Sequence, residues 1–301
     1  MSAIRFTEVG ARDGLQNEPR PVSLEAKVAF IDGLSLAGLD EIEAGAFVSP
    51  KAVPQMADSA EVFKRIKRAK GVQYSALVPN EKGLDAALEA KVDKIAVFTA
   101  ASETFNKKNI NASIAESIER FEPVVERAKK AKLPVRAYIS TAFFCPYEGK
   151  VAPEKVLGVV DSVASLGVDE LSIGDTIGRA APADVKRLLE LLLKKTSRDS
   201  VALHFHDTYG MAVANALTAW QDFGITSFDA STGGVGGCPY APGAGGNVAT
   251  EDLAFALKAQ GAPVRLDFTK LRAASDVLAS KLDHPLSSRL SRVAAKNLPG
   301  A

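Results

Sequence analysis

The chain has little histidine, cysteine or tryptophan and almost no net charge. Its 301 residues include 3 His, 2 Cys and 1 Trp, and the formal net charge is +1. Two cysteines are too few for a disulfide framework, and the balanced charge gives no sign of a nucleic-acid surface. Apolar runs stay well short of the roughly 20 residues that span a membrane. Because strand-like sequence begins at Ile4, we expect neither a signal peptide nor an Arg-rich transit peptide. We therefore expect a soluble, cytoplasmic protein that binds neither nucleic acid nor membrane.

Hydrophobic residues make up 47% of the chain, which is enough for a large buried core. Short apolar runs alternate with amphipathic stretches of helical periodicity. The predicted strands are Ile4–Val9, Glu41–Ala44, Gln73–Leu77, Lys94–Phe98, Val135–Ser140, Glu170–Ile173, Val201–His206 and Thr226–Ala230. This alternation predicts an α/β fold, a (β/α)8 TIM barrel. A doubly wound open sheet is the alternative, and the lack of dinucleotide-binding glycines after the first strand disfavours it.

Capping residues and first-turn prolines predict where helices begin. The candidate N-caps are Ser23, before a helix that runs to Ala37 and is ended by Gly38; Asn80, before Glu81–Ala90; Ser113, before a helix that runs to Lys132 and is ended by Pro134; and Thr250, before Glu251–Gln260. The candidate first-turn prolines are Pro153 and Pro182. The tail from Asp267 predicts one or two further helices. No linker-like stretch interrupts the pattern, so we expect one catalytic domain over residues 1–301, with a helical extension over about 267–301.

Polar residues gather after the predicted strands, at the barrel end where TIM-barrel enzymes carry their chemistry. They are Arg12 and Asp13 after the first strand, Glu43 on the second, Asp175 after the sixth, His204 and His206 on the seventh, and a glycine-rich stretch after the eighth. Closing the barrel would bring these distant residues to one mouth.

His204 and His206 are the strongest indication of a metal site. On a strand their side chains leave the same face about 6.5–7 Å apart, so both imidazoles can reach one ion. Two hydrogen-bonded core histidines are the alternative. Asp13 is the natural third ligand, or else a turn residue, and Asn247 offers an amide oxygen. Such a ligand set suits Mg²⁺ or Mn²⁺, although Zn²⁺ also accepts imidazole. The third histidine, His284, is expected to be a surface residue.

Arg12 is a candidate for holding a carbonyl oxygen that becomes an enolate. A structural salt bridge with Glu43 or Asp175 is the alternative, and the two roles are compatible. After the fourth strand, Lys107 and Lys108 form a basic pair that suits a phosphate-bearing ligand or, alternatively, a solvated loop.

The stretch 233–247 holds seven glycines in fifteen residues, which is typical of a loop that closes over a substrate. Cys238 lies in it, where a thiol suits proton transfer; an incidental cysteine is the alternative. Cys145 is expected to be a packing or pocket-wall residue, and a disulfide between the two is disfavoured in a cytoplasmic chain.

Six motifs span nearly the whole chain. They are Glu8–Glu18, Phe47–Lys51 with Val53–Met56, Lys107–Asn111, Gly174–Gly178, His204–Gly210 and Gly236–Ala241. With them the chain resembles the 3-hydroxy-3-methylglutaryl-CoA lyases, which belong to the metal-dependent lyase and Claisen-condensing TIM barrels. Gly236–Ala241 is the motif most specific to the lyases.

The resemblance implies retro-Claisen cleavage of 3-hydroxy-3-methylglutaryl-CoA to acetyl-CoA and acetoacetate, with a divalent cation (Mg²⁺ or Mn²⁺). It also implies homodimers and a role in leucine catabolism. The implied metal ligands are Asp13, His204, His206 and Asn247; the implied catalytic groups are Arg12, Cys238, Asp13, His204, Glu43 and Asp175; the implied acyl-CoA-binding residues are Arg12, Gln16, Lys107, Lys108 and Asn109. Arg12 would hold the thioester oxygen, Cys238 would move a proton, and Glu43 and Asp175 would orient their neighbours.

Departures from the family pattern keep alternatives open. Pro19 stands where the lyases often carry a basic residue, and Ala46 stands where a small hydroxyl residue is common. A lyase for a longer branched 3-hydroxyglutaryl-CoA is one alternative. A Claisen-type synthase is another, disfavoured by Leu15 and Cys238. A catalytically inactive binding barrel is a third, which the intact set of site residues disfavours.

Overall fold

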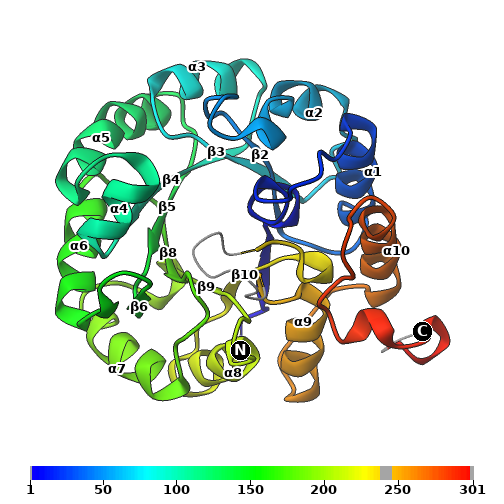
Figure 1. The fold of residues 1–301 in the computed structure, drawn as a ribbon. Helices are drawn as coiled ribbons and strands as arrows, with labels where there is room; N and C mark the ends of the chain where they lie inside the picture. The colour runs from blue at the N-terminus through cyan, green and yellow to red at the C-terminus, as the bar shows by residue number, and fades with distance from the viewer. Residues whose placement is uncertain (1, 238–245, 299–301) are drawn as a thin grey trace.

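The computed structural model describes residues 2–237 and 246–298. Within them, parallel strands close into a barrel in the order β1-β10-β9-β8-β5-β4-β3-β2, with the helices arranged around it (Figure 1). The barrel strands are β1 (Arg5–Glu8), β2 (Glu41–Ala46), β3 (Gln73–Leu77), β4 (Lys94–Ala100), β5 (Val135–Ser140), β8 (Glu170–Asp175), β9 (Val201–Phe205) and β10 (Ser227–Ala230). The predicted (β/α)8 barrel is confirmed.

All eight predicted strands are present, with differences at their ends. Strand β4 continues two residues beyond the predicted Phe98, because the buried residues Thr99 and Ala100 still pair with β5. Strand β9 ends at Phe205, so His206 lies outside it and instead forms an isolated antiparallel bridge with Asn247. The hairpin β6 (Phe144–Cys145) and β7 (Gly149–Lys150) was not predicted, since two-residue strands leave no periodic signal.

The described helices are α1 (Leu24–Leu34), α2 (Ser59–Arg65), α3 (Glu81–Glu89), α4 (Glu103–Ile110), α5 (Ile114–Lys130), α6 (Pro153–Ser165), α7 (Pro182–Leu192), α8 (Ala212–Phe223), α9 (Thr250–Ala259) and α10 (Phe268–Ala279). None of these is long and apolar enough to cross a membrane. The caps at Ser23, Asn80 and Ser113 are confirmed, because each side chain accepts a backbone N–H of the first turn. Helices α1 and α5 end three and two residues earlier than predicted, at Leu34 and Lys130.

The predicted cap at Thr250 is wrong. Helix α9 begins at Thr250 itself, and its N-cap is Ala249. The Thr250 hydroxyl is committed elsewhere, because it donates to Oε2 of the buried Glu8 at 2.7 Å. After α9, the predicted tail helix is α10, which packs beside α1 (Figure 1).

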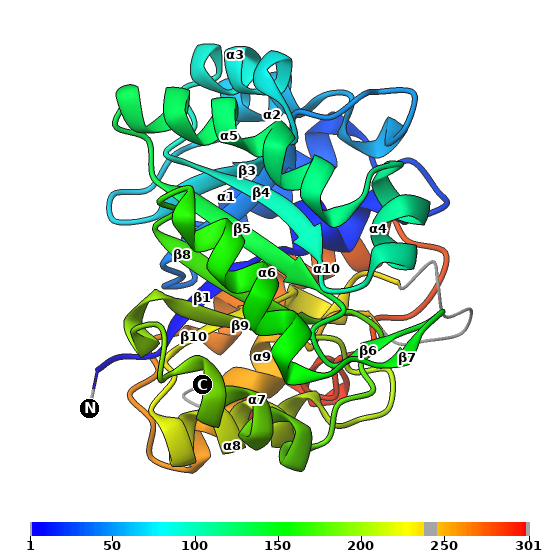
Figure 2. The same ribbon diagram turned by 90° about the vertical axis from the view of Figure 1, so that its left-hand side faces the viewer.

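Charged side chains, rather than apolar ones, fill much of the barrel interior. Near the amino ends of the strands, Lys94 Nζ lies 2.8 Å from Glu41 Oε2 and 2.6 Å from Glu170 Oε2. Further along, the fully buried Arg136 reaches across from β5 to Thr7 on β1. The apolar core lies outside the barrel, between strands and helices, with Phe30 and Leu34 of α1 among its fully buried members. The side view shows α4 and the β6–β7 hairpin at one end of this barrel (Figure 2).

Candidate active site

Strand β1 runs into a tight π-helical turn, Gly10–Gly14, that carries Arg12 and Asp13. The turn packs directly against the start of the glycine-rich segment: a Cβ added at Gly14 would lie 3.0 Å from the Val235 carbonyl oxygen. A side chain at residue 14 would therefore push the two segments apart. This close approach places Asp13 next to residues that follow β10.

Asp13, His204 and His206 converge at the carboxyl ends of the strands. Their ligand atoms lie within 4.8 Å of one another, a grouping that could hold a metal ion. Nε2 of each histidine is 3.9 Å from the same oxygen, Asp13 Oδ2. The imidazole centroids are 5.2 Å apart, so β9 and the residue after it present both rings to one point.

The charge states of this cluster suit a cation. Burial would raise the pKa of Asp13, but Arg12 and the two histidines lower it to about 2, so its carboxyl group is ionised. Burial and the neighbouring His204 lower the pKa of His206 to about 4, which keeps its imidazole neutral. His206 Nδ1 is buried without a hydrogen-bond partner among the described residues. A carboxylate and a neutral imidazole nitrogen are the ligand forms that a divalent ion requires.

Asn247 and Gln16 complete the surroundings of Asp13. Asn247 Nδ2 donates to Asp13 Oδ2 at 2.9 Å, and Gln16 Nε2 donates to Asp13 Oδ1 at 3.1 Å. Asn247 reaches the cluster because the end of the glycine-rich segment pairs with the end of β9: Val248 N donates to Phe205 O at 3.0 Å. The amide of Asn247 is therefore in the cluster, with its nitrogen facing Asp13.

Arg12 is buried and fixed from several sides. Its Nε donates to Glu43 Oε2 at 2.5 Å, and its Nη1 donates to Asp13 Oδ1 at 2.8 Å. Its guanidinium carbon lies 5.2 Å from the centroid of the Tyr138 ring, and the Tyr138 hydroxyl donates to Glu43 Oε2 at 3.3 Å. The salt bridge with Glu43 that the sequence offered as an alternative is present. Arg12 is thus a rigid cation next to Asp13.

Asp175 is a predicted site residue whose side chain has its hydrogen-bond partners in its own loop. Asp175 is buried at the end of β8, where it accepts the backbone N–H groups of Arg179 and Ala180 at 3.1 and 2.9 Å. Burial raises the pKa of Asp175 to about 6. Arg12 pairs with Glu43 and Asp13 instead of Asp175. Asp175 therefore shapes its own loop.

The remaining predicted residues fall into two groups. Lys107, Lys108 and Asn109 lie on the exposed side of α4, and Lys108 Nζ is 4.8 Å above the Tyr147 ring. Cys238 lies outside the described residues. Cys145 is buried, as expected of a packing residue, with its sulfur 3.0 Å from Ser102 Oγ.

Three residues of the site were missed by the sequence analysis: Arg136, Tyr138 and Asp229. Arg136 and Tyr138 are two apart on β5 and point inward, and Asp229 is the inward residue of β10 that contacts His204. A charged or phenolic residue in the middle of an apolar strand is the signal that would have found them.

His284, expected on the surface, is half-exposed and pairs with Glu18 Oε2 at 2.9 Å. Beside this pair is a cavity of about 340 Å³, also lined by Gly236 and Gly246.

Comparisons with known proteins find similar chains along nearly the whole length. The HMGL-like family profile matches residues 3–278. Hydroxymethylglutaryl-CoA lyase YngG of Bacillus subtilis is 48% identical over 286 residues, 95% of each chain. The 3-hydroxy-3-isohexenylglutaryl-CoA/hydroxy-methylglutaryl-CoA lyase of Pseudomonas aeruginosa is 47% identical over 289 residues, 96% of each chain. The solved structure of an HMG-CoA lyase from Acinetobacter baumannii, in complex with coenzyme A and 3-methylmalate, superposes with a TM-score of 0.92 at 39% identity, over 97% of this chain and 95% of that one.

Proposed function

The chain belongs to the HMGL-like family, and from this premise we propose that it is a carbon–carbon lyase that cleaves 3-hydroxy-3-methylglutaryl-CoA to acetyl-CoA and acetoacetate. The observation that carries the proposal is the convergence of Asp13, His204 and His206 beside the buried Arg12. The full-length similarity to named lyases supports the same reaction, and it favours neither a synthase nor an inactive barrel.

We propose that a divalent cation, Mg²⁺ or Mn²⁺, is held by Asp13, His204, His206 and the amide oxygen of Asn247. Turning the Asn247 amide by 180° would bring that oxygen toward Asp13, where the nitrogen now lies. Two imidazoles with two oxygen ligands leave positions open for substrate. When bound, the cation supplies Lewis acidity that lowers the pKa of the substrate hydroxyl.

Arg12 is proposed to stabilise the charge that develops on the thioester oxygen. In the cleavage, the tertiary hydroxyl loses its proton and becomes the ketone of acetoacetate. The electron pair of the broken C2–C3 bond passes to the thioester enolate, and a proton at C2 completes acetyl-CoA. Glu43 and Asp13 keep Arg12 in place before that charge forms, so little reorganisation is needed.

The remaining roles are proposed at the rim of the site. Lys107, Lys108 and Asn109, with Gln16, would contact the acyl-CoA. Asp175 would orient its neighbours through the loop that it shapes. We also propose a cytoplasmic homodimer that acts in leucine catabolism, and sedimentation velocity would measure the dimer.

The test is a direct assay. Purified protein is mixed with 3-hydroxy-3-methylglutaryl-CoA and Mg²⁺, with a matched EDTA control, and both products are quantified. We expect acetoacetate and acetyl-CoA in equal amounts, and neither in EDTA. A folded, metal-loaded protein that forms no product rejects this substrate; the 3-hydroxy-3-isohexenylglutaryl-CoA named for the Pseudomonas relative is the next to test.

Replacing His206 by alanine is expected to abolish metal binding, because one of the three convergent ligand groups is lost. Mn²⁺ titration followed by electron paramagnetic resonance measures the stoichiometry. His284→Ala is the matched control for loss of a histidine: His284 lies in a separate group with Glu18 and Asp283, so its loss should leave the Mn²⁺ bound at Asp13. Unchanged stoichiometry in His206→Ala would remove this residue from the ligand set.

Replacing Cys238 by serine is expected to lower kcat by a factor on the order of 10²–10⁴, the usual cost of losing a proton-transfer group. Cys145→Ser is the matched control for thiol loss, because Cys145 is buried against Ser102. The measurement is steady-state turnover under reducing conditions. Normal turnover in Cys238→Ser would make its thiol incidental.

A further inference from the structure

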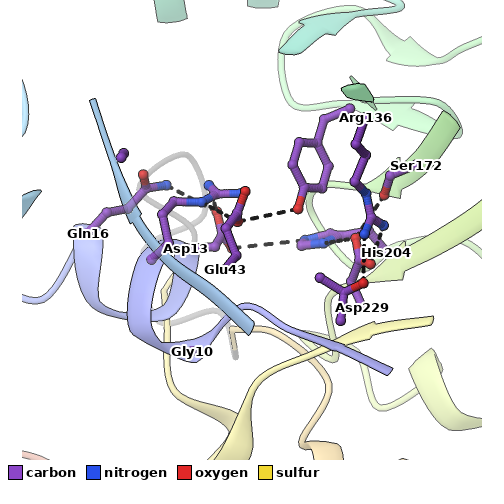
Figure 3. Close-up of polar contacts among 12 residues, drawn as sticks. Gly10, Asp13, Gln16, Glu43, Arg136, Ser172, His204 and Asp229 are labelled. Atoms are coloured by element: carbon purple, nitrogen blue, oxygen red, sulfur yellow. Dashed lines mark hydrogen bonds and ion pairs between the residues drawn. The ribbon is translucent and has the colours of Figure 1, made fainter. Parts of the chain in front are cut away.

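The side chain of Asp229 joins the proposed metal site to the charged interior of the barrel. Asp229 is on β10, is 1% exposed and receives hydrogen bonds on both carboxylate oxygens. Arg136 Nη2 donates to Oδ1. Ser172 Oγ donates to Oδ2 at 2.8 Å, and His204 Nδ1 lies 3.2 Å from the same Oδ2. Figure 3 shows Arg136, Ser172 and His204 gathered around this carboxylate.

This arrangement dictates which ring nitrogen of His204 carries a proton. A carboxylate can only accept hydrogen bonds, so the 3.2 Å contact requires the proton on His204 Nδ1. A neutral ring with its proton on Nδ1 has a free lone pair on Nε2, and it is Nε2 that faces Asp13 Oδ2 at 3.9 Å. We propose that Asp229 is a positioning residue that holds His204 in the Nδ1–H tautomer, with Nε2 ready to bind the cation, and that Arg136 keeps this carboxylate oriented.

His204 differs in this respect from its neighbour. The Nδ1 of His206 has no hydrogen-bond partner in the part of the chain that the structure describes. His204 is thus the histidine whose ring is fixed in both tautomer and angle by a side chain behind it. Carboxylate partners of this kind orient metal-binding histidines and raise the basicity of the ligating nitrogen.

Because Arg136 can only donate to residue 229, the single substitution Asp229→Asn is expected to switch the tautomer of His204. In Asp229→Asn, the single amide oxygen must face Arg136, because a guanidinium has donors only. The amide NH₂ then faces His204 Nδ1, which must accept, and the proton moves to Nε2. Ser172 can adapt, since its hydroxyl both donates and accepts. Asparagine has the same shape as aspartate, but His204 would then face the cation with a protonated Nε2, which has no lone pair to bind it.

The inference rests on the proposed metal-dependent function, and its test needs no substrate. Mn²⁺ affinity is measured by titration for wild type, Asp229→Asn and the matched control Glu170→Gln. Glu170 is an interior carboxylate that lies 3.6 Å from Arg136 and whose hydrogen-bond partners are Lys94 and Ser227. We expect the dissociation constant to rise about 10- to 100-fold in Asp229→Asn, and to stay unchanged in Glu170→Gln.

A second readout follows the proton directly. With three histidines in the chain, selective ¹⁵N-histidine labelling gives three imidazoles to assign. We expect metal-free wild type to carry the His204 proton on Nδ1 and Asp229→Asn to carry it on Nε2. A folded Asp229→Asn with wild-type Mn²⁺ affinity, or wild-type His204 protonated on Nε2, overturns the inference. If Asp229→Asn does not fold, the wild-type spectrum alone still tests the inference, because it shows which nitrogen of His204 carries the proton.

The outcomes separate this inference from the proposed function. Asp229-dependent Mn²⁺ binding without cleavage of 3-hydroxy-3-methylglutaryl-CoA would reject the substrate and keep the role of Asp229. Cleavage with an unaltered Mn²⁺ affinity in Asp229→Asn would keep the reaction and reject the positioning role.

Discussion

Replacing Arg12 by glutamine is expected to lower kcat by at least 10²- to 10³-fold, or about 3 kcal/mol of transition-state stabilisation. Its guanidinium is buried, tied to Glu43 and Asp13, and next to the three proposed metal ligands. Glutamine offers a neutral donor on a shorter side chain. The charge that forms on the thioester oxygen would then lack its fixed counter-charge.

The measurement is steady-state kinetics together with Mn²⁺ affinity and thermal unfolding. Arg5→Gln is the matched control: Arg5 begins β1, the strand that leads into the turn with Arg12, is half-exposed and lies 3.6 Å from Glu170. We expect Arg5→Gln to keep kcat, and Arg12→Gln to keep its bound metal. A near-normal kcat in Arg12→Gln would reduce Arg12 to its salt bridge with Glu43.

The strands and the two histidines were predictable from the sequence because alternation is a strong local signal. Residues 201–206 alternate, so the shared face of His204 and His206 is evident from the order of the amino acids alone. Asp13 and Asn247 required the closed barrel to bring the first and last strands together. That closure follows from the count of β/α units, so the cluster was predicted as a set.

The barrel-interior residues that contact this cluster were not predictable in the same way. Tyr138, Arg136 and Asp229 occupy inward positions of β5 and β10, and nothing in the local sequence shows that they meet. Arg136 on β5 reaches Thr7 on β1, which is 129 residues away. The Thr250 cap failed for a similar reason, since its hydroxyl is bound by Glu8 on β1. Contacts across the barrel are decided by strand register, which sequence periodicity does not report.

Replacing Lys94 by methionine is expected to destabilise the fold by about 3–5 kcal/mol, because it leaves two buried carboxylates without their shared cation. Urea unfolding at pH 7 measures the loss. Lys186→Met is the matched control: its ion pair with Asp222, at 2.7 Å, is half-exposed on both sides. We expect that control to lose less than about 1 kcal/mol.

The pH dependence tests whether charge is the cause. Burial would raise the pKa of Glu170, but Arg136 and Lys94 lower it to about 2, so its ionised form stabilises the wild type above the unfolded pKa. That stabilisation is lost as the pH falls through the folded pKa. In Lys94→Met the carboxyl group of Glu170 loses one of the cations that lower its pKa and takes up a proton more readily, so the deficit should be largest near neutral pH and shrink toward pH 3. A deficit that is constant with pH would assign the loss to packing of the lysine stem instead of its charge.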